Sequence, residues 1–300
     1  MSNGSSFPPP RRLRGTLLIA LAAVVAVGAA GWLVWRSPGG ARPHTGTSAA
    51  GSPAPDPKGG TAGPAAGPSA HPGNPHGSLK GRTVLLDPGH NPTNHDHTTQ
   101  IARLVDIGND RKECDTTGTS TDDGYAEASF SLDVARRART LLRAEGAKVV
   151  FTQDGDRPYG PCVDERAAIG NAAHADAAVS IHADGSAVGD RGFHVILPAR
   201  VQAGAADTSA ITGPSRDLGE RLAGRFVAAT GSAPSNYVGH GTGLDTRSDL
   251  GGLNLSTVPK VFIECGNMRD PKDAAELTDA QWRQKAARGI TEGITDFLTR

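Results

Sequence analysis

The sequence predicts an α/β fold over residues 80–300, a mostly parallel sheet with helices on both faces, built as a single domain. Short, β-branched and continuously apolar runs recur along this stretch. Such runs are typical of strands that are covered on both faces. Segments with helical periodicity separate the runs, and strands that alternate with helices indicate a parallel sheet between two helical layers.

Five runs are expected to form strands: 83–88, 147–153, 177–183, 192–198 and 260–266. Three of them end in, or just before, a residue that can bind a metal or move a proton, namely His90, His182 and Glu264. In parallel α/β sheets, ligands bind beyond the carboxyl ends of the strands. We therefore expect these three side chains to converge at one edge of the sheet.

Four helices are expected between and after these strands. The first covers 127–145, where apolar residues recur at spacings of three, four and seven and a glycine follows as a stop signal. Two more are expected near 164–174 and 215–230. The last helix is expected to begin with Thr278 as its N-cap and to run to residue 298.

Three segments precede the predicted domain. Residues 1–14 form a basic leader, expected in the cytoplasm, and residues 15–35 carry no charge. About 20 apolar residues span a bilayer, so 15–35 is expected to be a transmembrane anchor or, if it is cleaved, a signal peptide. Residues 36–79 contain almost no large apolar side chain and are expected to form a disordered linker. The protein is therefore expected in the cell membrane, single-pass with its domain outside the cytoplasm, or secreted.

Charge and cysteine content narrow the class of protein. Lysine plus arginine and aspartate plus glutamate each number 31, so the formal net charge is zero and nothing indicates a nucleic-acid partner. The sequence identifies no divisome or cell-wall regulator as a partner, and a monomer is expected.

Export permits disulfides. Cys114 and Cys162 lie in polar loops that a disulfide bridge could join, while Cys265 sits at a strand end.

The strand-end residues suggest a metal site. Two histidines and one carboxylate are a ligand set of catalytic zinc, with one position left for water. His90 and His182 supply the histidines. Glu127 is the expected third ligand because it opens the helix that follows the first strand. Glu264 then remains as the general base for water that the metal activates, with one Zn2+ expected per chain.

Other histidines have simpler interpretations. His95 and His97 look like a metal pair by composition, but they lie in a polar loop with no rigid element to fix them. His194, inside an apolar run, is expected to be a buried, hydrogen-bonded core residue. His174 is expected on a helix surface.

Four segments resemble, in this order, the motifs of the zinc-dependent N-acetylmuramoyl-L-alanine amidases of the amidase-3 type: VLLDPGHN, YAEASFSLDVARRARTLL, DERAAIGNAAHADAAVSIHADG and VPKVFIECGNM. The resemblance covers nearly all of residues 80–300. It is strongest to the compact, exported bacterial forms with a cysteine pair, which here would be Cys114 and Cys162. It implies that the chain hydrolyses peptidoglycan at the amide between the lactyl group of N-acetylmuramic acid and L-alanine of the stem peptide.

The resemblance also implies roles for single residues. The zinc ligands and the catalytic glutamate of the family match the residues chosen above: His90, Glu127, His182 and Glu264. Arg166 and Asn171 match a recurrent arginine and asparagine, interpreted as supports of the site. Cys265 stands where a glycine or another small residue usually follows the glutamate. The polar stretch 91–126 can hold a regulatory segment in relatives, and here a loop pinned by the cysteine pair is expected.

Other functions are alternatives. Cys265 with His182 or His90 would make a cysteine-dependent amidohydrolase. An inactive peptidoglycan-binding scaffold would suit the tethered arrangement equally well. A zinc hydrolase of another substrate, such as a peptidase or a sugar deacetylase, would use the same ligands.

Overall fold

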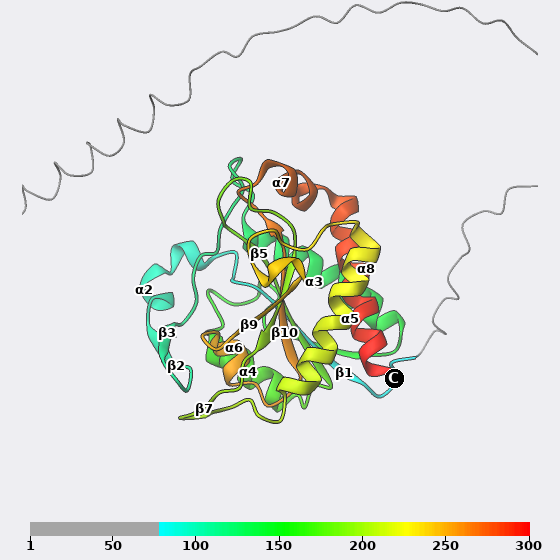
Figure 1. The fold of residues 1–300 in the computed structure, drawn as a ribbon. Helices are drawn as coiled ribbons and strands as arrows, with labels where there is room; N and C mark the ends of the chain where they lie inside the picture. Colours follow the sequence, from blue (N-terminus) through cyan, green and yellow to red (C-terminus); the bar gives the residue numbers. More distant parts are fainter. Residues whose placement is uncertain (1–77) are drawn as a thin grey trace, which may run out of the picture. The chain divides into compact units, whose positions relative to one another are not determined.

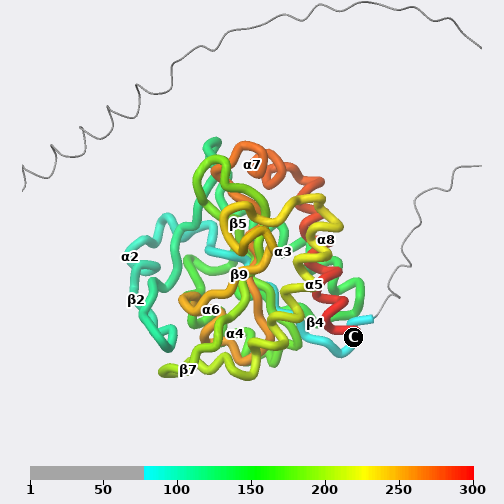
Figure 2. The backbone as a smooth tube through the Cα atoms, viewed as in Figure 1, coloured from blue at the N-terminus to red at the C-terminus, as the bar shows by residue number. Residues whose placement is uncertain are grey.

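The computed structural model describes residues 78–300, which are coloured in Figures 1 and 2. The predicted leader, anchor and all but the last two residues of the predicted linker lie outside the described residues. Within residues 78–300, no helix is long and apolar enough to cross a membrane. Leu79, which the sequence placed in the linker, is fully buried, and its N–H donates to the carbonyl of Glu145. The folded part therefore includes residues before 80.

A six-stranded sheet lies at the centre of the described chain, in the order β4-β1-β5-β10-β6-β9. Its strands are β1 (Thr83–Pro88), β4 (Lys148–Phe151), β5 (Ala177–Asp184), β6 (His194–Pro198), β9 (Leu244–Arg247) and β10 (Lys260–Asn267). Every neighbouring pair is parallel except β10 and β6, which are antiparallel. The predicted, mostly parallel α/β sheet is confirmed.

Helices cover both faces of this sheet (Figure 1). On one face lie α3 (Glu127–Ala144), α5 (Thr212–Thr230) and α8 (Ala280–Leu298); on the other lie α4 (Val163–Ala172) and α6 (Gly251–Asn254). Along β1, Val84 and Leu86 join the core shared with α3, α5 and α8, whereas Leu85 packs with Ile169 of α4. Because both faces are covered, successive strand residues are apolar, which explains the continuous runs in the sequence.

The strand β9 has no counterpart in the sequence prediction. It reads LDTR and lies at the edge of the described sheet, paired with β6. Its residues are only partly buried or exposed. A short, polar edge strand carries no apolar run, so periodicity cannot identify it.

The prediction that Thr278 caps the last helix was wrong. Thr278 ends a short helix, α7 (Pro271–Thr278), and its hydroxyl donates to the carbonyl of Ala274. Asp279 caps α8 instead, since its carboxylate accepts the N–H of Trp282 at 2.6 Å. A threonine hydroxyl already bonded within its own helix leaves the neighbouring aspartate as the available cap.

The segment between β1 and α3 forms an excursion beside the sheet. It contains η1 (Asn94–Asp96), α2 (Thr98–Ile101) and the antiparallel hairpin of β2 (Leu104–Asp106) and β3 (Arg111–Glu113). In Figures 1 and 2 the hairpin lies on the side away from α5 and α8. The remaining short elements are β7 (Gln202–Ala203), β8 (Ala206–Asp207) and η2 (Gly239–Gly241).

A disulfide closes this excursion. Cys114, just after β3, is bonded to Cys162, just before α4, across a sequence separation of 48. The cysteine pair that the resemblance implies is therefore confirmed. Cys265 is buried and unpaired in the described structure.

Candidate metal centre

His90, Glu127 and His182 meet at the carboxyl edge of the sheet. His90 follows β1, His182 lies near the end of β5, and Glu127 is the first residue of α3. One ligand-type atom from each lies within 4.8 Å of the others, and among residues 78–300 no other group of three His, Cys, Asp or Glu side chains meets that condition. Glu127 Oε1 lies 3.2 Å from His90 Nε2 and 2.8 Å from His182 Nδ1. The structure brings together the three residues predicted as ligands.

The backbone at the end of β1 makes this approach feasible. His90 has a φ of 58°, a left-handed conformation that residues other than glycine seldom adopt. A Cβ atom on Gly89 would lie 2.4 to 2.7 Å from atoms of the His182 ring. The glycine therefore lets β1 pass directly beside the second histidine, and the two imidazole centroids lie 5.0 Å apart.

The charges of the group suit a cation. Burial raises the pKa of Glu127, but the charge of His90 and the hydrogen bond to His182 outweigh burial and hold that pKa well below its usual range. Burial lowers the pKa of His90, yet Glu127 and Asp115 outweigh it and raise the pKa of His90 to about 10. Without metal, therefore, His90 holds a proton against the Glu127 carboxylate, and a metal cation would displace that proton.

The second nitrogen of His90 is also occupied. His90 Nδ1 lies 3.1 Å from Asp115 Oδ1 and 3.1 Å from the carbonyl oxygen of Thr116. Arg166 Nη2 donates to Asp115 Oδ2 at 2.9 Å. Arg166, predicted as a support, thus reaches the His90 imidazole through Asp115, a residue that the sequence did not single out. Its Nη2 also donates directly to the carbonyl oxygen of His90 at 3.1 Å.

Arg166 also belongs to a buried ionic network under the ligands. Its Nη1 donates to Asp87 Oδ1 at 2.8 Å, and Lys260 Nζ donates to Asp87 Oδ2 at 2.9 Å. The hydroxyls of Thr152 and Ser180 donate to the same carboxylate. Burial raises the pKa of Asp87, but Lys260 and Arg166 outweigh it and keep the carboxylate charged. Sequence reasoning missed this network, although a carboxylate inside an apolar strand was a signal for it.

Asn171 does not join the ligands. Its amide donates to the carbonyl of Leu255 at 2.9 Å, and its Oδ1 accepts the N–H of Thr257 at 2.8 Å. Both contacts lie in the loop that leads to the amino end of β10. Asn171 therefore fastens that loop to α4 and makes no hydrogen bond to a ligand in the described chain.

Glu264 lies beside the metal group. It pairs with His182 across β10 and β5, so the two side chains share one face of the sheet, and both line a cavity of about 330 Å3 with His90 and Glu127. Glu264 Oε2 is buried and has no hydrogen-bond partner within residues 78–300. Burial, with the charges of Glu127 and Asp184, raises the pKa of Glu264 well above its ordinary value. A carboxyl with a raised pKa and an oxygen free of protein partners is suited to accept a proton.

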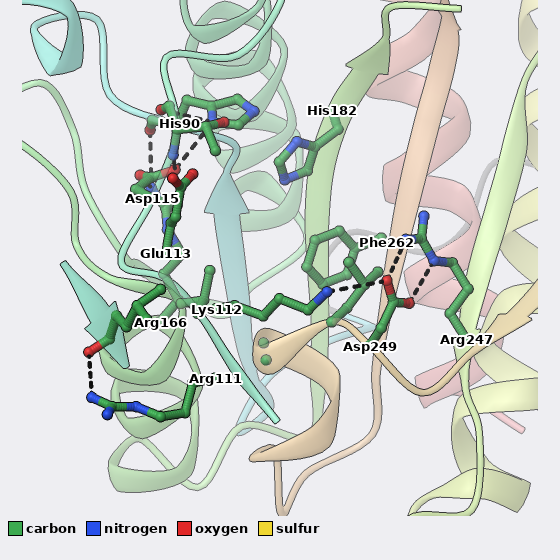
Figure 3. A pocket seen from close by; sticks show the side chains of 16 residues that line it. His90, Arg111, Lys112, Glu113, Asp115, Arg166, His182, Arg247, Asp249 and Phe262 are labelled. Atoms are coloured by element: carbon green, nitrogen blue, oxygen red, sulfur yellow. Dashed lines mark hydrogen bonds and ion pairs between the residues drawn. The ribbon is translucent and has the colours of Figure 1, made fainter. Parts of the chain in front are cut away.

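A second cavity of about 510 Å3 adjoins the first. Figure 3 shows His90 and His182 at one end of it, with Asp249 between Lys112 and Arg247 farther along. Its walls come from the β2–β3 hairpin, α6 and the start of α4, and they are mainly apolar. The two cavities together give an elongated molecule room beside the metal group.

The other candidate residues lie elsewhere. His95 is exposed, and the ring of His97 packs 5.2 Å from that of Tyr159. His194 is buried as expected, but its Nδ1 has no hydrogen-bond partner in the part of the chain described, contrary to the expected bonding.

Burial and the charge of Glu264 raise the pKa of Cys265 well above its usual value. A thiol kept protonated in this way is a poor nucleophile, which argues against the cysteine-dependent alternative.

Comparisons with known proteins agree with this geometry. Residues 84–296 match the family model Amidase_3, described as N-acetylmuramoyl-L-alanine amidase. The chain is 40% identical over 226 residues to the N-acetylmuramoyl-L-alanine amidase Rv3717 of Mycobacterium tuberculosis, covering 74% of this chain and 88% of that protein. The crystal structure of the amidase Ami1 from Mycobacterium smegmatis matches with a TM-score of 0.68 at 42% identity, over 73% of this chain and 98% of that one. Ami1 from Mycobacterium abscessus matches with a TM-score of 0.67 at 39% identity, over 73% and 100%.

Proposed function

The chain belongs to the Amidase_3 family of N-acetylmuramoyl-L-alanine amidases, and from this membership we propose a zinc-dependent cleavage of peptidoglycan. The bond cleaved is the amide between the lactyl group of N-acetylmuramic acid and L-alanine of the stem peptide. The observation that carries the proposal is the group of His90, Glu127 and His182 with Glu264 beside it.

The donors of this group fit zinc. Catalytic zinc sites commonly use three protein ligands drawn from histidine nitrogens and carboxylate oxygens, at about 2.0–2.2 Å from the metal. Glu127 Oε1 lies 3.2 Å from His90 Nε2 and 2.8 Å from His182 Nδ1, and atoms so spaced can share one ion at such distances. The contact between His90 Nδ1 and Asp115 leaves Nε2, which faces Glu127, as the ligand atom. We infer that these three residues hold one Zn2+ per chain.

Bound zinc would supply Lewis acidity, which polarises a carbonyl oxygen and makes water acidic near neutral pH. The chain's own residues supply the rest. Glu264 Oε2, buried and without a partner in the described chain, takes a proton from the attacking water. It then gives the proton to the alanine nitrogen as the amide breaks. The raised pKa of Glu264 favours the first transfer, because it makes the carboxylate a stronger base.

The site of action follows from the substrate. Peptidoglycan lies outside the cytoplasm, and the disulfide between Cys114 and Cys162 suits an oxidising compartment. Together they support the prediction that residues 1–79 export the domain, with 15–35 as a membrane anchor or a cleaved signal peptide. The domain is proposed to act as a monomer.

Zinc content measured alongside digestion tests the proposal. The full-length chain is purified, zinc per chain is determined by mass spectrometry, and purified peptidoglycan is digested with and without a chelator. About one zinc per chain, and chelator-sensitive release of stem peptides with free L-alanine amino termini, are expected. Zinc binding without release of that product would refute peptidoglycan as the substrate. Activity that survives the removal of zinc would refute the zinc-dependent mechanism.

A further inference from the structure

We propose that Asp115 is a positioning residue for His90, and that the Cys114–Cys162 disulfide holds Asp115 in place. The sequence and the family motifs single out neither role. The proposal rests on the proposed zinc site, because His90 must be a ligand for its orientation to matter.

The first step is the contact between the carboxylate and the imidazole. Asp115 Oδ1 lies 3.1 Å from His90 Nδ1, and Asp115 is only 6% exposed. An imidazole that donates one N–H to a carboxylate has its tautomer and its ring orientation fixed, and its other nitrogen becomes more basic. Asp115 therefore directs His90 Nε2 towards Glu127, where the metal would lie.

The second step is the way in which Asp115 is itself held. Its Oδ2 accepts Arg166 Nη2 at 2.9 Å, and its Oδ1 accepts the N–H of Thr116 at 2.8 Å. The remaining groups of the guanidinium are occupied, since Nε donates to the carbonyl of Pro161 and Nη1 to Asp87. The arginine is thus a fixed anchor on α4.

The third step is the covalent link. Cys114 directly precedes Asp115, and Cys162 directly precedes α4, the helix that carries Arg166. The carbonyl of Cys114 also accepts the N–H of Val163 at 2.8 Å. The disulfide therefore joins the segment that bears Asp115 to the helix that bears its anchor, at the point where the two must stay aligned.

Noncovalent packing gives this junction little other support. The cluster around the disulfide contains few buried apolar residues, and the hairpin that precedes Asp115 carries the exposed Leu104. Without the covalent link, the segment would be held mainly by this small cluster and by hydrogen bonds. We therefore expect loss of the disulfide to weaken zinc binding, because Asp115 would no longer be held beside His90.

The test measures zinc affinity in the full chain by competition with a fluorescent chelator. The variants are Asp115→Ala, Asp115→Asn and the double variant Cys114→Ser with Cys162→Ser. The control is Asp106→Asn, an exposed carboxylate of the same excursion whose side chain accepts the N–H of Gly108. Circular dichroism checks that each variant is folded.

Asp115→Ala is expected to raise the zinc Kd by about 10- to 100-fold. Asp115→Asn keeps an oxygen that can accept from His90, so it should raise Kd less and rescue part of the loss, which a general structural defect would not allow. The double cysteine variant should raise Kd by about tenfold, and the control should not change it.

Each outcome decides a separate point. Weak zinc binding by the unmodified chain would overturn the proposed metal site itself. The unmodified chain could also bind zinc tightly while both Asp115→Asn and Asp115→Ala have a zinc Kd within about twofold of its own. That result would overturn the role of Asp115 alone. A normal Kd in the double cysteine variant would overturn the role of the disulfide. Should Asp115→Ala fail to fold, the isosteric asparagine variant decides the role of Asp115.

Discussion

Replacing Glu264 by glutamine is expected to remove most turnover, to leave zinc bound, and to stabilise the metal-free protein at neutral pH. Glutamine keeps the size of the side chain but cannot take a proton from water. It also removes a carboxylate that lies near Glu127 and Asp184 and whose Oε2 has no hydrogen-bond partner in residues 78–300. The same substitution should therefore damage catalysis and improve folding.

The magnitudes follow from these surroundings. A positioned general base contributes about 10²- to 10⁴-fold to the rate, so kcat should fall by that factor. The pKa of Glu264 is raised in the folded protein, so above the ordinary glutamate pKa of 4.5 the folded state holds more protons than the unfolded state. Stability therefore falls as pH rises from 4.5 towards the folded pKa, and glutamine removes this loss. Each kcal/mol regained in this way raises Tm by about 2–4 °C in a domain of this size.

The assay compares Glu264→Gln with Glu220→Gln, a matched substitution of an exposed carboxylate on α5 that lines neither cavity. Zinc-loaded protein is assayed on purified peptidoglycan, and chelated protein is melted at about pH 4.5 and about pH 7.5. Glu264→Gln should show the higher Tm at the upper pH only, and Glu220→Gln should behave as the unmodified chain. Turnover within about threefold of the unmodified chain would refute the role of Glu264 as base. Loss of zinc from the variant would refute its placement outside the ligand set.

Three further predictions follow. Because the pKa of His90 is raised to about 10 without metal, zinc must displace a proton from it, so zinc affinity should rise about tenfold per pH unit between about pH 7 and about pH 9; a flat profile in competition titrations would contradict this. The replacement Lys260→Met leaves Asp87 buried with one cation fewer and should lower the free energy of unfolding by about 3–5 kcal/mol, measured by urea denaturation; an unchanged midpoint would show that the pair is dispensable. Gly89→Ala would place a Cβ 2.4 to 2.7 Å from the imidazole of the β5 ligand and should weaken zinc binding, whereas Gly224→Ala, which meets nothing within 4 Å, should not.

The sequence predicted the sheet well because burial on both faces leaves a strong signal. The five apolar runs all became strands, and the first helix begins at Glu127 as expected. The prediction failed where two adjacent residues could equally well cap a helix, and where a strand contains no apolar run. Thr278 and Asp279 are adjacent cap residues, and only the formation of α7 decides between them. The edge strand β9 has too few apolar residues to be recognised.

The convergence of the three proposed ligands was predictable for a topological reason, because parallel strands bring their carboxyl ends to one edge. His90 and His182 meet because each lies at or near the carboxyl end of a parallel strand. Glu127 joins them because it begins the helix that follows the first strand. Asp115 was not predictable in this way. It stands in a polar loop, where a carboxylate normally faces solvent, and it becomes a partner of His90 only because the chain folds back and a disulfide closes there.

The two sides of the site differ in how fully their charges are paired, and this difference matches what each side must do. On the side of the proposed ligands, Asp87, Arg166 and Asp115 alternate in sign and lead to His90 through contacts of 2.8 to 3.1 Å. Such a chain holds a ligand in one orientation, since movement of any member would leave a buried charge without its partner. On the other side, the Oε2 atom of Glu264 has no hydrogen-bond partner in the described chain, although it is buried. A general base must keep an oxygen free for the proton it receives, so the costly unpaired group stands where the proposed reaction requires it.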